Sequence, residues 1–230
     1  MNDGLVILQV IFRPTIPSLC SSKRDTKMIT ENAVVVGNVY DKYTSTNFLA
    51  RCLFRKFLKN VIEMVKWTNC SDIHEIGCGE GHLSAILSQI PNTSVRASDF
   101  STKIIREATK NYPSIIFEVR DIYNLDQIHD SACLIVCCEV LEHLKDPEKV
   151  LNVLPKISKE YVLLSVPREP IWRAMNIARG NYLKQLGNTP GHVQHWSKSA
   201  FLKMLSKRFE IIDVRVPLPW TIVLCKAREL

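Results

Sequence analysis

The strongest constraint on the fold comes from a glycine-rich run, Gly77-Cys78-Gly79-Glu80-Gly81, that lies between an apolar segment and a helical one. Glycine has no Cβ, so a backbone of this composition can turn tightly and let a ligand approach closely. A strand, a glycine turn and a helix in this order predict a ligand site at the helix N-terminus. The spacing is G-x-G-x-G, which differs from the G-x-G-x-x-G of dinucleotide-binding domains. A turn with a purely structural role is the alternative.

Short apolar runs alternate with helical stretches from Asp72 onward, and this alternation predicts a parallel sheet with helices on both faces. An amphipathic helix is expected before the sheet, over residues 46–67. The predicted strands have the sequences IHEIGCG, SVRASD, IIFEVRD, CLIVCCE and YVLLSV, and the predicted helices cover residues 81–90, 101–111 and 146–157.

The C-terminal part departs from this alternation. The strand patterns FEIIDVRV and TIVLCKA are separated only by Pro217–Trp220, which is too short for a crossover helix, so the two strands should pair antiparallel. We therefore expect a Rossmann-like, doubly wound α/β fold with a mostly parallel seven-stranded sheet and a C-terminal antiparallel hairpin. An all-parallel dinucleotide-binding domain is disfavoured.

Acidic residues follow the next two predicted strands. Asp99 comes after SVRAS and Asp121 after IIFEVR. A carboxylate at the tip of the second strand is placed to accept hydrogen bonds from both hydroxyls of a ribose, and one at the third tip can meet a purine edge. Each could instead cap a helix N-terminus. Together with Glu75, the acids favour a single bound nucleoside.

These segments resemble the class I S-adenosylmethionine-dependent methyltransferases, particularly the ubiquinone/menaquinone-biosynthesis type. The resemblance runs from about Tyr40 to the C-terminus and rests on HEIGCGEGHL, ASDFS, VRDIYNL and CCEVLEHLKDPEKVL. It implies S-adenosylmethionine as cofactor, with the methionine part near the glycine turn and the adenine near the third strand. The cofactor-binding residues that it implies are Glu75, Gly77, Cys78, Gly79, Asp99, Phe100, Asp121, Ile122 and Glu139.

Candidate catalytic residues are His143, His192 and His195. Methyl transfer needs a base only when the acceptor is a weakly acidic hydroxyl, since most of the rate can come from positioning. Glu139-x-x-Glu142-His143 is similar to a pattern in metal-dependent methyltransferases of small RNAs and of some quinone precursors. A divalent cation is therefore an open alternative, but the sequence alone assigns no metal ligand, and a structural histidine at a helix start fits equally.

Residues 168–208 form an insertion after the fifth strand, on the side where such folds bind substrates. The insertion carries eight basic residues and the single acid Glu169, with Trp172, Tyr182 and Trp196 interleaved. This composition favours an acceptor that bears phosphate or carboxylate. A solvated helix face is the alternative for residues 198–208.

We predict one methyltransferase domain over residues 28–230, with residues 1–27 as a disordered tail or an upstream mis-start. The eight cysteines lie mostly in apolar runs without a C-x-x-C pair, so reduced thiols in a cytoplasmic protein with no transmembrane segment are expected. The predicted activity is methyl transfer to a small or lipid-like, anionic acceptor, at oxygen. An RNA methyltransferase and a non-catalytic nucleoside-binding partner protein are the alternatives.

Overall fold

The computed structural model describes residues 29–31, 34–36 and 47–228. Strands β1 (Ile29–Glu31) and β2 (Val34–Val36) form a small antiparallel pair. The stretch 1–27, which the sequence analysis interprets as a tail, lies outside the described residues.

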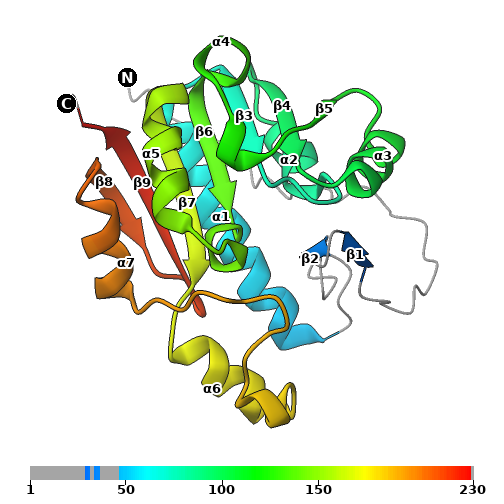
Figure 1. Cartoon of the computed structure of the whole chain (residues 1–230), viewed down its shortest axis with the longest axis vertical. Helices are drawn as coiled ribbons and strands as arrows, with labels where there is room; N and C mark the ends of the chain where they lie inside the picture. The colour runs from blue at the N-terminus through cyan, green and yellow to red at the C-terminus, as the bar shows by residue number, and fades with distance from the viewer. Residues whose placement is uncertain (1–28, 32–33, 37–46, 229–230) are drawn as a thin grey trace, which may run out of the picture.

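The core is a seven-stranded sheet with the order β5-β4-β3-β6-β7-β9-β8 (Figure 1). Its central strands pair parallel, whereas β9 is antiparallel to both of its neighbours. This confirms the predicted doubly wound sheet and its terminal hairpin. The strands are β3 (Asp72–Ile76), β4 (Ser94–Asp99), β5 (Ile116–Val119), β6 (Ala132–Cys138), β7 (Ser158–Pro167), β8 (Phe209–Arg215) and β9 (Trp220–Ala227).

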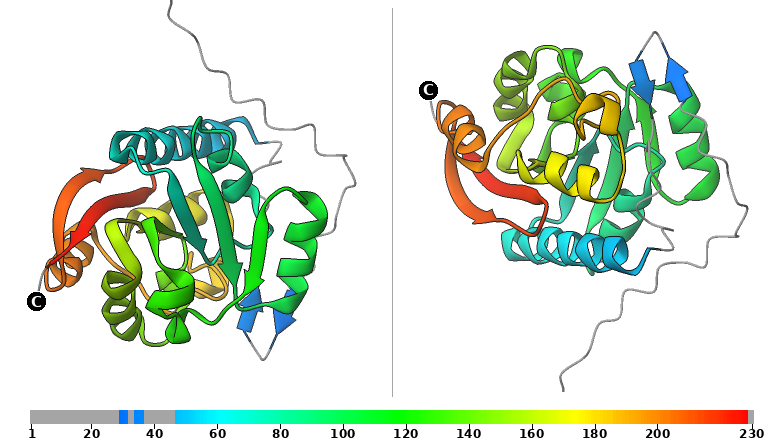
Figure 2. Two further views of the ribbon diagram at one scale, coloured as in Figure 1. Left: turned by 90° about the horizontal axis from the view of Figure 1, so that it is seen from above. Right: turned by 90° about the horizontal axis from the view of Figure 1, so that it is seen from below.

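Helices cover both faces of the sheet (Figure 2). Apolar side chains of α1 and α2 pack with β3 and β9 in one buried cluster, and those of α5 and α7 pack with β6 and β7 in the other. The helices are α1 (Phe48–Thr68), α2 (His82–Leu87), α3 (Thr102–Asn111), α4 (Gln127–Asp130), α5 (Pro147–Ile157), α6 (Ile171–Ala178) and α7 (Lys198–Leu205), with short 3-10 turns η1 (Ile122–Asn124), η2 (Leu141–His143) and η3 (Leu183–Gln185).

The long helix α1 has an asparagine as the capping residue at each end. Asn47 caps the N-terminus by accepting a hydrogen bond from the amide of Ala50, at 3.1 Å. Asn69 ends the helix in the left-handed region, with φ of 54°. Between these caps the buried residues recur at helical spacing, which confirms the helix predicted for this region.

The reversed strand β9 brings a tryptophan to the ligand-binding edge of the sheet. In its pairing with β7, Trp220 lies opposite Pro167, the last residue of β7. The amino end of β9 therefore lies at the edge where the parallel strands have their carboxyl ends, the edge at which ligands bind in such folds.

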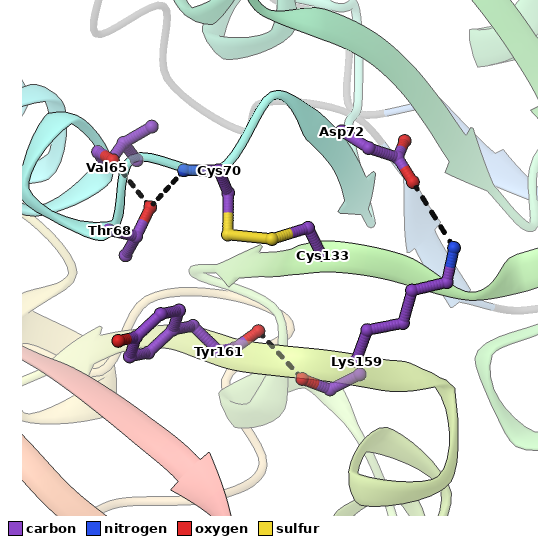
Figure 3. Close-up of a disulfide and its surroundings, with 8 residues drawn as sticks. Val65, Thr68, Cys70, Asp72, Cys133, Lys159 and Tyr161 are labelled. Atoms are coloured by element: carbon purple, nitrogen blue, oxygen red, sulfur yellow. Dashed lines mark hydrogen bonds and ion pairs between the residues drawn. A yellow bond between two sulfur atoms is a disulfide. The ribbon is translucent and has the colours of Figure 1, made fainter.

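The structure corrects the expectation that all cysteines are reduced. Cys70 and Cys133 form a disulfide between the chain just before β3 and the neighbouring strand β6 (Figure 3). The two residues are 63 positions apart in sequence but sit at the same end of adjacent parallel strands, so sequence spacing alone gives no sign of the bond. The other described cysteines are free thiols, and of these only Cys52 is exposed.

Within the described residues, no helix combines the length and apolar character that crossing a bilayer requires. The predicted insertion lies between β7 and β8 and contains α6, η3 and α7. α7 buries Phe201, Met204 and Leu205, so this part of the insertion is the solvated amphipathic helix that was the alternative interpretation.

Candidate active site

The glycine turn after β3 shows why glycine is needed at two of its positions. Gly77 has φ of 73°, and a Cβ there would lie 2.4 Å from the side chain of Val140. Gly79 has φ of 54°, and a Cβ there would meet no heavy atom within 4 Å. The first glycine thus allows close packing, whereas the second combines a left-handed backbone with open space on its ligand side.

A cavity of about 530 Å³ adjoins this turn. It continues from the carboxyl ends of β3, β4 and β6 to the first half of α1, to α6 and to the start of β9. It brings together most of the residues predicted from the sequence. The predicted residues that line it are Glu75, Gly77, Cys78, Gly79, Asp99, Phe100, Ile122, Glu139, His143 and His192.

Asp99 is held in place by the backbone around it. Its two carboxylate oxygens accept hydrogen bonds from the amides of Gly79, at 3.1 Å, and Ser101, at 3.0 Å. Burial raises the pKa of this carboxyl group, and the two amide bonds partly offset that effect. The result is a fixed acceptor at the tip of β4, beside the glycine turn.

Glu75 is a buried carboxyl group at the base of the cavity. It accepts a hydrogen bond from the hydroxyl of Ser84 on α2. Burial is the main cause that raises the pKa of Glu75 to about 8, and the negative charge of Asp99 adds to it. A positive charge in the cavity would stabilise the ionised form.

Glu139 sits at the end of β6 with φ of 60°, in the left-handed region. Its carboxylate accepts hydrogen bonds from the Ser165 hydroxyl, at 3.1 Å, and from the indole Nε1 of Trp220, at 2.7 Å. Sequence reasoning missed both partners. No local pattern could reveal Trp220, because it lies 81 residues from Glu139 and reaches it only through the reversed strand.

A second polar cluster lies farther along the cavity. One ligand atom each of Glu142, His143 and His192 lie within 4.8 Å of one another. Nδ1 of His143 donates to the backbone carbonyl of Gly191, at 3.0 Å, so in the neutral ring Nε2 is the nitrogen that can accept a proton or bind a cation. The amide of Val193 donates to the carbonyl of Glu142 and holds this loop against η2.

One carboxylate and two imidazoles fit a divalent cation, since this is a common ligand set of transition metals. The bond from His143 to the carbonyl of Gly191 matches the second contact that a metal-binding imidazole usually makes. The carboxylate of Glu139 points instead to Ser165 and Trp220. The E-x-x-E-H pattern therefore contributes one of its two acids to this cluster.

Two predicted residues do not line the cavity. The exposed Asp121 caps η1, accepting from the amide of Tyr123 at 3.0 Å, which is the alternative role considered for it. Its position follows from the early end of β5 at Val119, two residues before it. His195 is exposed and bonded to the side chain of Asn188 at 2.8 Å.

Aromatic side chains form another wall of the cavity, and of these the sequence pointed only to Trp172, as part of the insertion. Trp220 packs against Phe57 of α1, with ring centroids 4.9 Å apart, and against Trp172 of α6, at 5.7 Å. Trp172 in turn lies 5.8 Å from the ring of His192. This aromatic wall connects α1, α6 and β9 around the far end of the cavity.

The basic residues of the insertion contribute less to the cavity than the sequence suggested. Among them only Arg179 belongs to the described lining. Lys207 and Arg208 form ion pairs with Glu148 on α5, at 3.2 Å and 2.6 Å. Most of the insertion's charge is thus directed to solvent or to other parts of the fold.

Comparison with known proteins agrees with this architecture. Residues 73–159 match the family described as methyltransferase domain. The chain is 26% identical to the ubiquinone biosynthesis O-methyltransferase of Cupriavidus pinatubonensis, over 58% of this chain and 61% of that enzyme. It is 25% identical to a protein of Invertebrate iridescent virus 6 named as methyltransferase 235L, over 47% of this chain and 42% of the other. The matches thus span about half the length of these curated relatives.

Solved structures share the fold at low sequence identity. Magnesium protoporphyrin IX methyltransferase of Synechocystis PCC 6803, with bound S-adenosylhomocysteine, superposes with a TM-score of 0.61 at 19% identity, covering 80% of this chain and 89% of that one. The PH0226 protein of Pyrococcus horikoshii OT3 gives a TM-score of 0.63 at 15% identity, covering 83% and 97%.

The family match covers the glycine turn and the central strands, and the sheet order with its reversed strand is shared with the solved structures. The relationship to the ubiquinone biosynthesis O-methyltransferases, first inferred from the motifs, is a distant one. Residues 73–159 thus match a methyltransferase domain, and the chain has the fold of the class I S-adenosylmethionine-dependent methyltransferases.

Proposed function

We propose that the protein transfers a methyl group from S-adenosylmethionine to a hydroxyl oxygen of a small or lipid-like acceptor that carries a negative charge. One observation carries this proposal: a continuous cavity joins the glycine turn and Asp99 to the imidazoles of His143 and His192 and to Arg179. Cofactor groups and acceptor groups would therefore share one cavity.

The first part of the cavity suits the cofactor. Asp99 would accept the ribose hydroxyls, with Phe100 and Ile122 on either side of the adenine. The amides of the glycine turn and the buried Glu75 would face the methionine end, where the positive sulfonium and ammonium groups favour the ionised carboxylate. This arrangement would leave the rest of the cavity, with the aromatic wall, to the acceptor.

The second part of the cavity suits the acceptor. Methyl transfer forms an oxygen–carbon bond as the sulfur–carbon bond breaks, so the acceptor hydroxyl must lose its proton. Because Nδ1 of His143 donates to Gly191, Nε2 is the nitrogen of the neutral ring that would accept that proton. The aromatic wall would position the acceptor body and exclude water, and Arg179 would bind its anionic group.

We further propose that Glu142, His143 and His192 hold a divalent cation, which would lower the pKa of the acceptor hydroxyl. Treatment with EDTA, followed by activity assays with and without added Mg²⁺, Mn²⁺ or Zn²⁺, tests this part separately. Activity that is lost with chelator and restored by a metal supports the cation. Full activity in EDTA contradicts it and leaves His143 as the direct base.

The experiment that tests the whole proposal starts from the natural ligands. Small molecules that co-purify with the protein are identified by mass spectrometry, and labelled S-adenosylmethionine is then incubated with fractionated extract. Label that moves into an acidic small-molecule or lipid fraction supports the proposal. Label that moves into RNA would instead support the alternative acceptor class, and cofactor binding with no transfer to any fraction would support a non-catalytic protein.

A further inference from the structure

Apolar side chains are exposed around the mouth of the cavity. Five of them, between 45% and 73% exposed, lie at the start of α1 and on the segment from α6 to η3, and we call them the cavity rim. The cavity rim consists of Phe48, Leu49, Ile177, Leu183 and Leu186. Exposed aliphatic and aromatic side chains gathered at one place are costly in water and mark an interaction surface.

The chain order places the cavity rim on the segments that line the cavity. Asn47 and Ala50 line the cavity, and Phe48 and Leu49 stand between them in α1. On the other side Asn181 and Tyr182 line the cavity.

The exposed Leu183 follows these two residues on the second side of the mouth. α6 and the start of α1 lie at the same end of the molecule (Figure 1), and the view from below shows α6 facing the reader beside α1 (Figure 2). Two separate segments therefore present apolar residues around one mouth.

The segments that carry the cavity rim are positively charged. α1 has no acidic residue before Glu63, and it exposes Arg51 and Arg55. From Pro170 to Phe209 the chain contains no acidic residue at all, and Lys184 is exposed there. The combination of apolar side chains and cations without carboxylates is complementary to a surface that is both apolar and negatively charged.

We propose that the cavity rim docks on an anionic lipid bilayer, so that a lipid-like acceptor can enter the cavity directly from the membrane. The proposal rests on the proposed function only for the nature of the acceptor. The apolar side chains would lie among the acyl chains near the headgroups, and the arginine and lysine side chains would bind lipid phosphates. The association is peripheral, since no described helix can span a bilayer.

The observations favour a bilayer over RNA. An RNA surface would use the cations and flat aromatic rings, and exposed leucines would add nothing to it. In the cavity rim three of the five residues are aliphatic side chains on the insertion, and the aromatic Trp172 and Trp220 are turned inward to the cavity wall.

Vesicle flotation of the full chain without cofactor tests the proposal. Phosphatidylcholine vesicles that also contain phosphatidylglycerol should carry the protein to the top of the gradient, and pure phosphatidylcholine vesicles should carry much less. A Leu183→Glu/Leu186→Glu double variant should lower the partition coefficient by about tenfold or more, because each leucine that enters the bilayer contributes roughly that factor.

The matched control is Ile128→Glu. Ile128 is 88% exposed on α4, which lies at the opposite end of the molecule from α6 (Figure 1). The control introduces one glutamate, against two in the double variant, at an apolar surface residue far from the cavity, and it should float like the wild type. Circular dichroism and calorimetry with S-adenosylhomocysteine verify that both variants fold and bind ligand.

Equal flotation of the double variant and the wild type would overturn the proposal, as would equal binding to neutral and anionic vesicles. Binding of RNA or of a second copy of the chain at the cavity rim, without vesicle binding, would also overturn it. Because flotation needs no turnover, its failure is distinguishable from failure of the methyl-transfer proposal, which is read from cofactor binding and label transfer.

Discussion

The carboxylate of Asp99 is held in a fixed position by backbone amides. The amides of Gly79 and Ser101 fix both of its oxygens, so the carboxylate does not have to be ordered on binding. Each oxygen keeps a lone pair that a hydroxyl group can use. The residue therefore joins the glycine turn to the proposed ribose position.

Replacement of Asp99 by alanine should weaken binding of S-adenosylhomocysteine by well over tenfold. Two hydroxyl hydrogen bonds to a charged group contribute about 1.5–3 kcal/mol each. Isothermal titration calorimetry measures the affinity. Asp146→Ala is the matched control, because Asp146 also caps a backbone amide, that of Lys149, but lies outside the cavity. An unchanged affinity in Asp99→Ala would remove the ribose assignment.

Glu75 predicts a dependence of stability on pH. Its pKa is about 8 in the fold, against an ordinary value of 4.5 for a glutamate side chain, so the folded state binds more protons than the unfolded state between pH 4.5 and pH 8. The free energy of unfolding contributed by this group should therefore fall as pH rises from about 4.5 to about 8, by up to roughly 1.4 kcal/mol per pH unit.

Urea unfolding of the cofactor-free wild type and of Glu75→Gln across this range measures the effect. The glutamine cannot ionise but can still accept a hydrogen bond from Ser84. The variant should therefore gain stability relative to the wild type as the pH rises. A constant difference across the range would show that Glu75 is not buried as described.

Individual site residues differ in how far the sequence can predict them. The glycine turn and Asp99 follow from local patterns, because a turn after a strand determines their geometry. Asp121 and His195 were expected in the site, but a side chain at a loop can turn either way, and these two turn to a backbone amide and to Asn188. The position of Trp220 could be predicted only from the pairing of β9 with β7.

At the scale of elements, β9 determines the shape of the site. Its first residue supplies the indole that binds Glu139 and packs between α1 and α6. Sequence patterns predicted the hairpin of β8 and β9, but not that its amino end would bring Trp220 to the cavity. The pairing with β7 decides this, and pairing between strands distant in sequence leaves no periodic signal.

The two tryptophans of the aromatic wall offer a matched comparison. Nε1 of Trp220 donates to the carboxylate of Glu139 at 2.7 Å, whereas Nε1 of Trp172 donates to the hydroxyl of Thr189 at 2.9 Å. A phenylalanine at either position keeps an aromatic ring and removes the donor. Trp220→Phe should lower the free energy of unfolding by about 1.5–3 kcal/mol and Trp172→Phe by about 1 kcal/mol, because bonds to charged groups are stronger.

Denaturant unfolding of both variants and the wild type checks this order. An equal loss of unfolding free energy in the two variants would indicate that the hydrogen bond to the Glu139 carboxylate is no stronger than one to a neutral group.

The disulfide between Cys70 and Cys133 makes a second prediction at this scale. It closes a loop between residues 63 positions apart, and in the chain-entropy account a loop of this length stabilises the fold by about 4 kcal/mol. Adding a reductant should lower the free energy of unfolding of the wild type by about that amount. Cys70→Ser should be equally destabilised and should not respond to the reductant. If alkylation of the unreduced, unfolded protein labels every cysteine, the bond does not form.

For the whole molecule, the alternation of strands and helices was enough to predict the layers and a mostly parallel sheet, because right-handed crossovers leave few arrangements. The sequence did not reveal the disulfide or the β1–β2 pair. It also overestimated how much of the insertion's charge faces the cavity, since Lys207 and Arg208 pair with Glu148 instead. These features depend on contacts between distant segments.

Because the cavity is lined by segments from α1 to β9, ligand binding should stabilise the entire domain. S-adenosylhomocysteine at about one hundred times its dissociation constant should raise the free energy of unfolding by about 2.7 kcal/mol, if it binds only the folded state. Thermal or denaturant unfolding with and without the ligand measures this. Stabilisation by NAD in place of S-adenosylhomocysteine would contradict the assigned cofactor.

The direction of β9 also has a practical consequence. The strand starts at the cavity and runs away from it, and the end of β9 in Figure 1 lies far from α6. A biotin attached at that end would tether the protein to a biosensor with the cavity mouth turned to the solution. Association rates of nucleosides and capture of vesicles could then be measured on molecules held in one orientation.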